Sequence, residues 1–135
     1  MIDITTNGIL YFNSNVQNFI KKYQNNLSFS ISIDGNKELH DSCRKFPNGE
    51  GSYDLVIKAV RDYQKYNHYL GNKMTISPEN INFLFDGIKK LIQENYKNIF
   101  FNCIYEKGWE NFHGAILYNE LKKITNFILA NNLDT

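Results

Sequence analysis

Apolar residues recur at helical spacing in four stretches of this chain. These stretches are Val16 to Tyr23, Leu55 to Tyr63, Ile81 to Ile92 and Ile116 to Ile128. Residues three and four positions apart lie on one face of a helix, so each stretch predicts an amphipathic helix that buries a single stripe. Ser14 and Ser52 are predicted N-caps, and Ser77-Pro78 predicts a hydroxyl cap before a proline at the first helical position.

A short run of strand-forming residues precedes each predicted helix. The four runs are Ile2 to Thr6, Leu27 to Ile33, Lys73 to Ser77 and Ile99 to Tyr105. Such alternation of strand and helix predicts a parallel sheet with right-handed crossovers. The chain has 135 residues, 42% of them hydrophobic, which is the size of one domain, so we expect a single unit over residues 1–135.

The second run alternates along its length. Its apolar residues (Leu27, Phe29, Ile31, Ile33) point to one face, and its polar residues (Ser28, Ser30, Ser32, Asp34) point to the other. Strands of an open parallel sheet are normally apolar on both faces, whereas in a β/α barrel only the outer face meets helices. The pattern therefore favours an α/β fold that forms a partial (β/α) barrel, with four parallel strands alternating with four helices. An open flavodoxin-like sheet, and an edge or antiparallel strand with one wet face, stay open as alternatives.

Charge and composition restrict the partners. Fifteen basic and fourteen acidic residues leave a net charge of +1, so no electrostatic footprint points to nucleic acid or to an anionic membrane. No apolar run approaches the roughly 20 residues of a membrane span, and we expect a cytoplasmic protein. Cys43 and Cys103 lie too far apart for a CxxC metal pair, so both are expected to be reduced thiols, with Cys103 in the core.

Polar residues gather where the predicted strands end. Asn7 follows the first strand, Ser32 and Asp34 end the second, and residues 105–109 follow the fourth. Ligands of parallel β/α folds bind at these carboxyl ends, although such loops are polar in any protein of this kind. We expect Trp109 to pack and anchor its loop.

The connection from Asp34 to Gly51 is much longer than the usual two to six residues, which is typical of functional or disordered loops. Arg44 offers a planar fork of donors to a carboxylate, and His40 and Asp41 are expected to pair and fix the loop. The sequence contains no metal-ligand spacing, no recognisable Ser-His-Asp signature and no glycine-rich phosphate loop.

Two linked motifs carry a resemblance to a known family. The first runs SIDGNKELHDSCRKFPNGEGSYD over residues 32–54, and the second is Thr6-Asn7-Gly8-Ile9-Leu10. Together they resemble the third and fourth strands of radical SAM enzymes of the sulfatase-maturase and SPASM-type peptide-maturase group. The resemblance covers the whole chain and implies that it corresponds to strands three to six of a six-stranded partial barrel.

The resemblance also implies a cofactor site. It assigns Ser32, and less directly Arg44, to the methionine part of S-adenosylmethionine, with Asn7 and Asp34 lining the same mouth. It further implies a parent enzyme that uses a 4Fe-4S cluster to make a 5'-deoxyadenosyl radical and modify a peptide or protein substrate.

The chain departs from the family in its cysteines. It has no CxxxCxxC motif to supply three cluster thiolates, no Gly-Gly-Glu strand end and no cysteine-rich auxiliary domain. We therefore expect the isolated chain to bind no cofactor and to be inactive, as a fragment of a larger enzyme or as a degenerate homologue kept as a binding module. The fragment is favoured because the chain opens at a strand and stops after a helix, and its two open sheet edges predict dimerisation or strand swapping.

Overall fold

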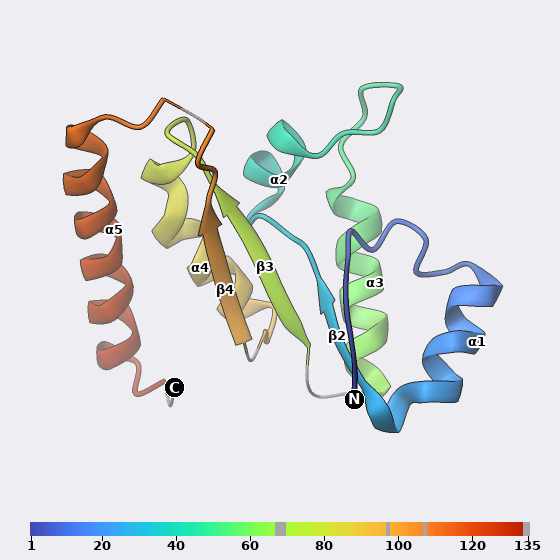
Figure 1. The fold of residues 1–135 in the computed structure, drawn as a ribbon. Helices are drawn as coiled ribbons and strands as arrows, with labels where there is room; N and C mark the ends of the chain where they lie inside the picture. The colour runs from blue at the N-terminus through green and yellow to red at the C-terminus, as the bar shows by residue number, and fades with distance from the viewer. Residues whose placement is uncertain (67–69, 97, 107, 134–135) are drawn as a thin grey trace.

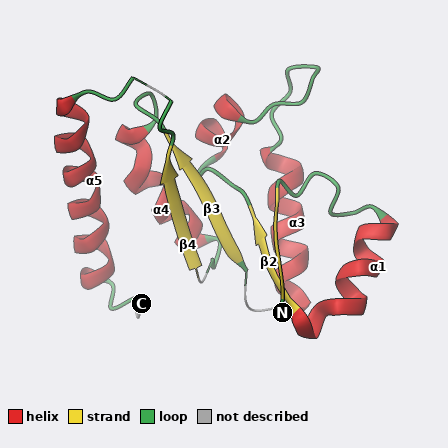
Figure 2. Ribbon diagram, viewed as in Figure 1, coloured by secondary structure: helices red, strands yellow, loops and turns green. Residues whose placement is uncertain are grey.

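A computed structural model describes residues 1–66, 70–96, 98–106 and 108–133. Its four strands are β1 (Ile2–Thr6), β2 (Leu27–Ile31), β3 (Gly71–Ile76) and β4 (Asn98–Cys103). Its α-helices are α1 (Ser14–Tyr23), α2 (Lys37–Cys43), α3 (Tyr53–Tyr66), α4 (Leu84–Gln93) and α5 (Asn111–Ala130), and short 3₁₀ turns cover Gln24–Asn26 (η1) and Ile81–Phe83 (η2) (Figures 1 and 2).

The four strands are parallel and lie side by side in the order of the sequence, β1-β2-β3-β4. A doubly wound sheet reverses its strand order at a switch point, whereas a barrel wall adds each strand beside the last. The fold is therefore the predicted partial β/α barrel, and the open flavodoxin-like sheet is not what forms.

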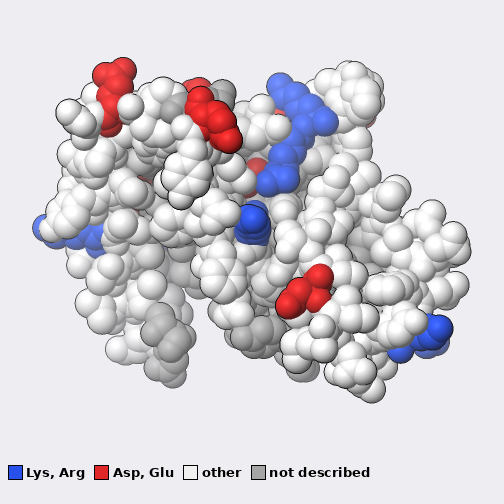
Figure 3. All heavy atoms as spheres, in the orientation of Figure 1, with Lys and Arg blue, Asp and Glu red and all other residues white. Residues whose placement is uncertain are grey.

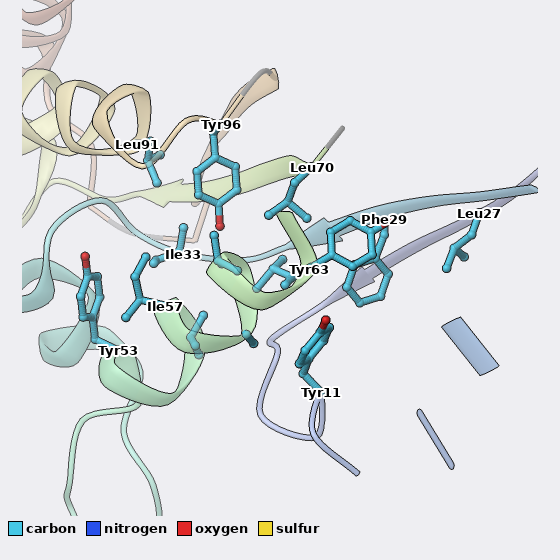
Figure 4. Close-up of a cluster of buried hydrophobic side chains, with 14 residues drawn as sticks. Tyr11, Leu27, Phe29, Ile33, Tyr53, Ile57, Tyr63, Leu70, Leu91 and Tyr96 are labelled. Carbon is cyan, nitrogen blue, oxygen red and sulfur yellow. The ribbon is translucent and has the colours of Figure 1, made fainter. Parts of the chain in front are cut away.

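The apolar face of the sheet packs on two clusters of buried side chains. In the first, Phe29 and Ile31 of β2 contact α3, with the Phe29 and Tyr63 ring centroids 4.9 Å apart (Figure 4). In the second, Met74 and Ile76 of β3 pack against α4 and α5. Because α1, α3, α4 and α5 all contribute to these clusters, the described helices cover one face of the sheet and leave the other open (Figure 1).

The open face is polar, as the alternation along β2 predicts. Ser28, Ser30 and Ser32 are half-buried there, and Lys73 of β3 is exposed. Phe100 of β4, 62% exposed, is the exception among these polar neighbours. Figure 3 views the molecule in the same orientation and shows scattered charges of both signs, in keeping with the net charge of +1.

Side chains hold β2 and β3 together where their backbones separate. The ladder between these strands has one registered pair, Ser30 with Gly71, whereas β3 and β4 are paired from end to end. Beyond that pair, Asn72 Oδ1 accepts from the Ile33 amide at 3.1 Å, and Asp34 Oδ1 accepts from the Thr75 amide at 3.0 Å. Two buried side chains thus replace backbone hydrogen bonds along this seam.

Several predicted details are wrong. The described chain has five α-helices rather than four, because α2 forms inside the long connection; its seven residues are too few to show a helical period. Strand β2 ends at Ile31, two residues early, because Ile33 and Asp34 turn to side-chain partners. Cys103 is half-buried on the last strand rather than in the core.

The predicted caps are also replaced by neighbouring side chains. Asn13 rather than Ser14 caps α1, its Oδ1 accepting from the Asn15 amide at 2.9 Å. After Ser77 the chain makes a turn, with Asn80 Oδ1 accepting from the Ser77 amide, and α4 begins only at Leu84. In both places an asparagine side chain, rather than the serine hydroxyl, accepts from a nearby backbone amide.

Strands β1 and β4 form the two edges of this sheet. Their unpaired backbone groups are the basis of the predicted dimerisation or strand swapping, which stays a prediction. Within the described residues no helix is long and apolar enough to cross a membrane.

Gly35 shows why a glycine follows Asp34. Its φ is +84°, a region that side chains disfavour, and a Cβ at this position would lie 2.4 Å from the Cα of Gly87 in α4. The backbone after β2 therefore touches the backbone of α4, and this contact sets how closely α4 approaches the sheet.

Gly35→Ala is expected to lower the free energy of unfolding by about 2–4 kcal/mol, from left-handed strain and overpacking together. Urea unfolding followed by circular dichroism measures this. Gly114→Ala in α5 is the matched control, because nothing lies within 4 Å of its Cβ position and alanine favours a helix by up to about 1 kcal/mol. Equal stability of the two variants would contradict the close approach.

Candidate functional site

The predicted site residues lie at the carboxyl end of the sheet, but in two different roles. Ser32 is half-buried just beyond β2, and its amide donates to the Thr6 carbonyl at 2.8 Å. Asn7 is exposed just beyond β1, where its Oδ1 accepts from the Ile9 amide at 3.2 Å. Period two places both on the open face, at the ends of neighbouring strands.

Asp34 and Arg44 instead bind each other. The Asp34 side chain is 2% exposed, and its Oδ2 accepts from Arg44 Nε at 2.5 Å while Oδ1 accepts from Nη2 at 3.2 Å. The fork predicted for Arg44 does meet a carboxylate, and that carboxylate belongs to this chain. The pair uses Nε and Nη2, so Nη1 is the guanidinium nitrogen that lies outside it.

His40 is buried at the centre of the long connection. Its Nδ1 accepts from the Asp34 amide at 3.3 Å, which places the ring proton on Nε2, and Nε2 lies 3.0 Å from Ser52 Oγ. Ser52 Oγ in turn donates to the Arg44 carbonyl at 3.1 Å. Burial lowers the pKa of His40 to about 4, so the imidazole is neutral at pH 7 and acts as a structural bridge.

Asp41 completes the same assembly from α2. Its Oδ1 accepts from the Tyr53 amide at 2.8 Å and so caps α3, the role expected of Ser52. A Cβ at Gly51 would lie 2.0 Å from the Asp41 carboxyl carbon, so a larger residue there would push this carboxylate away from the Tyr53 amide. His40 and Asp41 do fix the loop, as expected, although each does so through other partners rather than by pairing.

Two further polar residues lie on the open face near the carboxyl ends of their strands. Thr75 of β3 and Asn102 of β4 are neighbours in the strand register and fall on the open face by period two. Sequence reasoning missed Thr75, although Lys73 to Ser77 alternates polar and apolar residues, as the second run does, and this alternation was the signal that could have found it. With Asn7 and Ser32 they form a row of hydroxyl and amide groups across the four strand ends.

The loop after β4 is anchored by Trp109, as predicted. Its Nε1 donates to the Ile104 carbonyl at 2.6 Å, and its ring packs against the second cluster. His113 is buried beside it, and its Nδ1 accepts from the Glu110 amide at 2.8 Å. Lys107, in the same predicted rim, lies outside the described residues.

The donor set can be compared with the two cofactors that the resemblance implies. Hydroxyl and amide groups at the strand ends suit a polar ligand such as S-adenosylmethionine. An iron–sulfur cluster needs cysteine thiolates, and the cysteines here are Cys43 on α2 and Cys103 on β4. Since the described residues contain no group of three or more metal-ligating side chains, they do not fit a cluster by themselves.

Asp34→Asn tests the central ion pair. The amide removes the negative charge and replaces one acceptor oxygen with an NH2 donor, which would face the donors of Arg44 or Thr75. The free energy of unfolding should therefore fall by about 2–4 kcal/mol. Chemical denaturation at pH 7 measures it. Asp54→Asn is the matched control, because Asp54 pairs with Lys37 but its side chain is 70% exposed, and it should cost less than about 1 kcal/mol. Similar losses in both variants would contradict a structural role for Asp34.

His40 predicts a pH dependence of stability. Its pKa is about 4 in the fold, against 6.5 when unfolded, so the unfolded chain takes up the proton first as pH falls. Stability is therefore full above about pH 6.5 and declines toward pH 4, by up to about 3 kcal/mol. Asp34, Arg44, Asp41 and Lys37 face this histidine with partly cancelling effects on its pKa.

Urea unfolding midpoints from pH 7.5 to 4.5 measure this decline. His40→Gln should be less stable than the unsubstituted protein at pH 7 and should lose less stability across this range. Parallel pH profiles for the two proteins would show that His40 does not carry the effect.

Comparison with known proteins places the fold. No family model matches the sequence, and no curated protein matches it. The structure resembles native anSMEcpe with bound AdoMet, with a TM-score of 0.76 and 21% identity, over 97% of this chain and 37% of that chain. It also resembles native anSMEcpe with bound AdoMet and Cp18Cys peptide, with a TM-score of 0.78 and 19% identity, over 96% of this chain and 38% of that chain. The chain thus spans less than half the length of each protein that it resembles.

Proposed function

We propose that this chain forms the S-adenosylmethionine-facing part of a radical SAM enzyme of the sulfatase-maturase and SPASM-type peptide-maturase group. The observation that carries the proposal is the one-sided sheet, whose open polar face ends in Asn7 and Ser32 at the two motifs of the resemblance. The likeness to anSMEcpe, a radical SAM sulfatase maturase, supports it.

The residues divide between binding and positioning. Ser32 would hydrogen-bond the methionine part of the cofactor through its hydroxyl, with Asn7 beside it across the β1–β2 pair. Arg44 would contact the methionine carboxylate through Nη1, because Asp34 holds its other two nitrogens. Asp34 then acts as a positioning residue that fixes the plane of the guanidinium.

The remaining chemistry must come from outside residues 1–135. A 4Fe-4S cluster would supply the electron that cleaves the sulfonium, and the two cysteines of this sequence are too few to hold it. A peptide or protein substrate is proposed because the similar protein has been solved with a bound peptide. A cytoplasmic location is proposed with it, where the free thiols of Cys43 and Cys103 stay reduced.

The test begins with the reading frame that precedes Met1, over the roughly 60 to 100 residues that two more βα units would occupy. We expect an in-frame CxxxCxxC motif there. The extended protein, reconstituted anaerobically with iron and sulfide, should then convert S-adenosylmethionine to 5'-deoxyadenosine, measured by liquid chromatography. Ser32→Ala should weaken cofactor binding by about three- to tenfold, the value of one hydrogen bond.

Ser28→Ala is the matched control, because Ser28 lies on the same face of β2 but at its amino end. It should leave cofactor affinity unchanged, and the 135-residue chain alone should yield no 5'-deoxyadenosine. An unrelated gene upstream, or equal affinities in the two serine variants, would count against the proposed role.

A further inference from the structure

Asn48 lies at the tip of the hairpin of residues 45–51, which joins α2 to α3. The Gly49 amide donates to the Phe46 carbonyl at 2.9 Å across the turn, and Asn48 and Gly49 are both exposed. An asparagine that precedes a glycine cyclises readily, because glycine has no side chain to hinder attack by its own backbone nitrogen. The tip of the hairpin therefore presents a reactive pair of residues to solvent.

Hydrogen bonds polarise the side chain of Asn48 for this attack. Its Oδ1 accepts from the Glu50 amide at 3.1 Å, and its Nδ2 donates to Glu50 Oε2 at 2.9 Å. The Glu50 amide therefore points at the oxygen on which negative charge develops when the side-chain carbonyl is attacked. A Cβ at Gly49 would meet nothing within 4 Å, so no packed atoms oppose a movement of the turn, and opening it locally costs little.

Asn7 and Gly8 form the other asparagine–glycine pair of the sequence, and the fold encloses it. Gly8 is buried; its amide donates to Thr6 Oγ1 at 3.2 Å, and its carbonyl accepts from the Tyr11 amide at 3.1 Å. A Cβ at Gly8 would lie 3.0 Å from Ile31 Cγ2. The nitrogen that would attack Asn7 is therefore fixed among packed side chains, and it moves only if this part of the core opens.

We propose that Asn48 is a site of spontaneous deamidation, whereas the fold protects Asn7. The Gly49 nitrogen loses its proton to solvent and attacks Asn48 Cγ; the new C–N bond closes a succinimide ring, and the Cγ–Nδ2 bond breaks to release ammonia. Water then opens the ring at either carbonyl and leaves an aspartyl or isoaspartyl residue at position 48. Water is the co-reactant and no electrons are transferred. This inference does not rest on the proposed function.

The change at position 48 reaches Arg44 through the base of the hairpin. Lys45 and Gly51 form an antiparallel bridge there, and the Arg44 carbonyl accepts from the Ser52 amide at 3.2 Å. An isoaspartyl residue adds a methylene group to the backbone of the turn, so these paired segments no longer match in length. Deamidation therefore loosens the attachment of α2 to α3 and the placement of Arg44 between them.

The test is to incubate the protein at pH 8 and 37 °C and to quantify the asparaginyl, aspartyl and isoaspartyl forms by peptide mapping with mass spectrometry. Position 48 should convert at least about tenfold faster than position 7, because attack on Asn7 requires the packing around Gly8 to open. The same incubation in urea removes the fold and should bring the two rates within about threefold of each other. Equal rates in the folded protein, or no conversion at position 48, would overturn the proposal.

Asn48→Gln is the matched variant, because glutamine would have to close a larger ring and so stays intact over the same time. The incubated unsubstituted protein should unfold at a lower urea concentration than the fresh protein, whereas incubated and fresh Asn48→Gln should unfold at the same one. Conversion should also slow at pH 6, since the attacking nitrogen must lose its proton. An unchanged unfolding midpoint after full conversion at position 48 would overturn the proposed effect on α2 and α3.

Discussion

The buried carboxylate of Asp34 is the interaction on which this end of the molecule depends. It accepts from the Thr75 amide of β3 and from two nitrogens of Arg44, while its own amide donates to His40. A carboxylate that is 2% exposed is stable only when its oxygens are satisfied in this way. One side chain thus joins the β2–β3 seam to the long connection and sets the position of α2.

This junction explains how a connection from Asp34 to Gly51 is ordered despite its length. His40, Ser52 and Arg44 form a buried chain of hydrogen bonds, and Asp41 ties α2 to the start of α3. The neutral histidine suits such a bridge, because it accepts at one nitrogen and donates at the other without a buried charge. The ordered connection in turn lines part of a cavity of about 590 Å³.

The fold was predictable where a pattern repeats, and less so where single side chains decide. The period-two alternation of β2 predicted a sheet with one open polar face, and the helical stripes predicted α1, α3, α4 and α5. The cap at Ser14 was wrong because Asn13, one residue earlier, accepts from the Asn15 amide in the first turn of α1. The cap at Ser77 was wrong because the chain turns there, with Asn80 accepting from the Ser77 amide, and α4 begins only at Leu84. Helix α2, with seven residues, has no period to detect, and the partners of Asp34 and Asn72 lie about 40 positions away. No local rule identifies contacts of that separation.

The same contacts give most residues of the 32–54 motif a structural role. Gly35 is required by its positive φ and by the backbone of α4, Gly51 by the Asp41 carboxylate, and His40 and Asp41 by the fixing of α2. Most of the motif therefore has a structural role in this chain. Ser32 stands apart, because its alternation on β2 aims its hydroxyl at the open face, and Arg44 keeps Nη1 outside its pair with Asp34. The motif is thus stronger evidence for the fold than for the chemistry. The argument for a cofactor depends on Ser32 and Arg44, whose hydroxyl and Nη1 lie outside the hydrogen bonds described above.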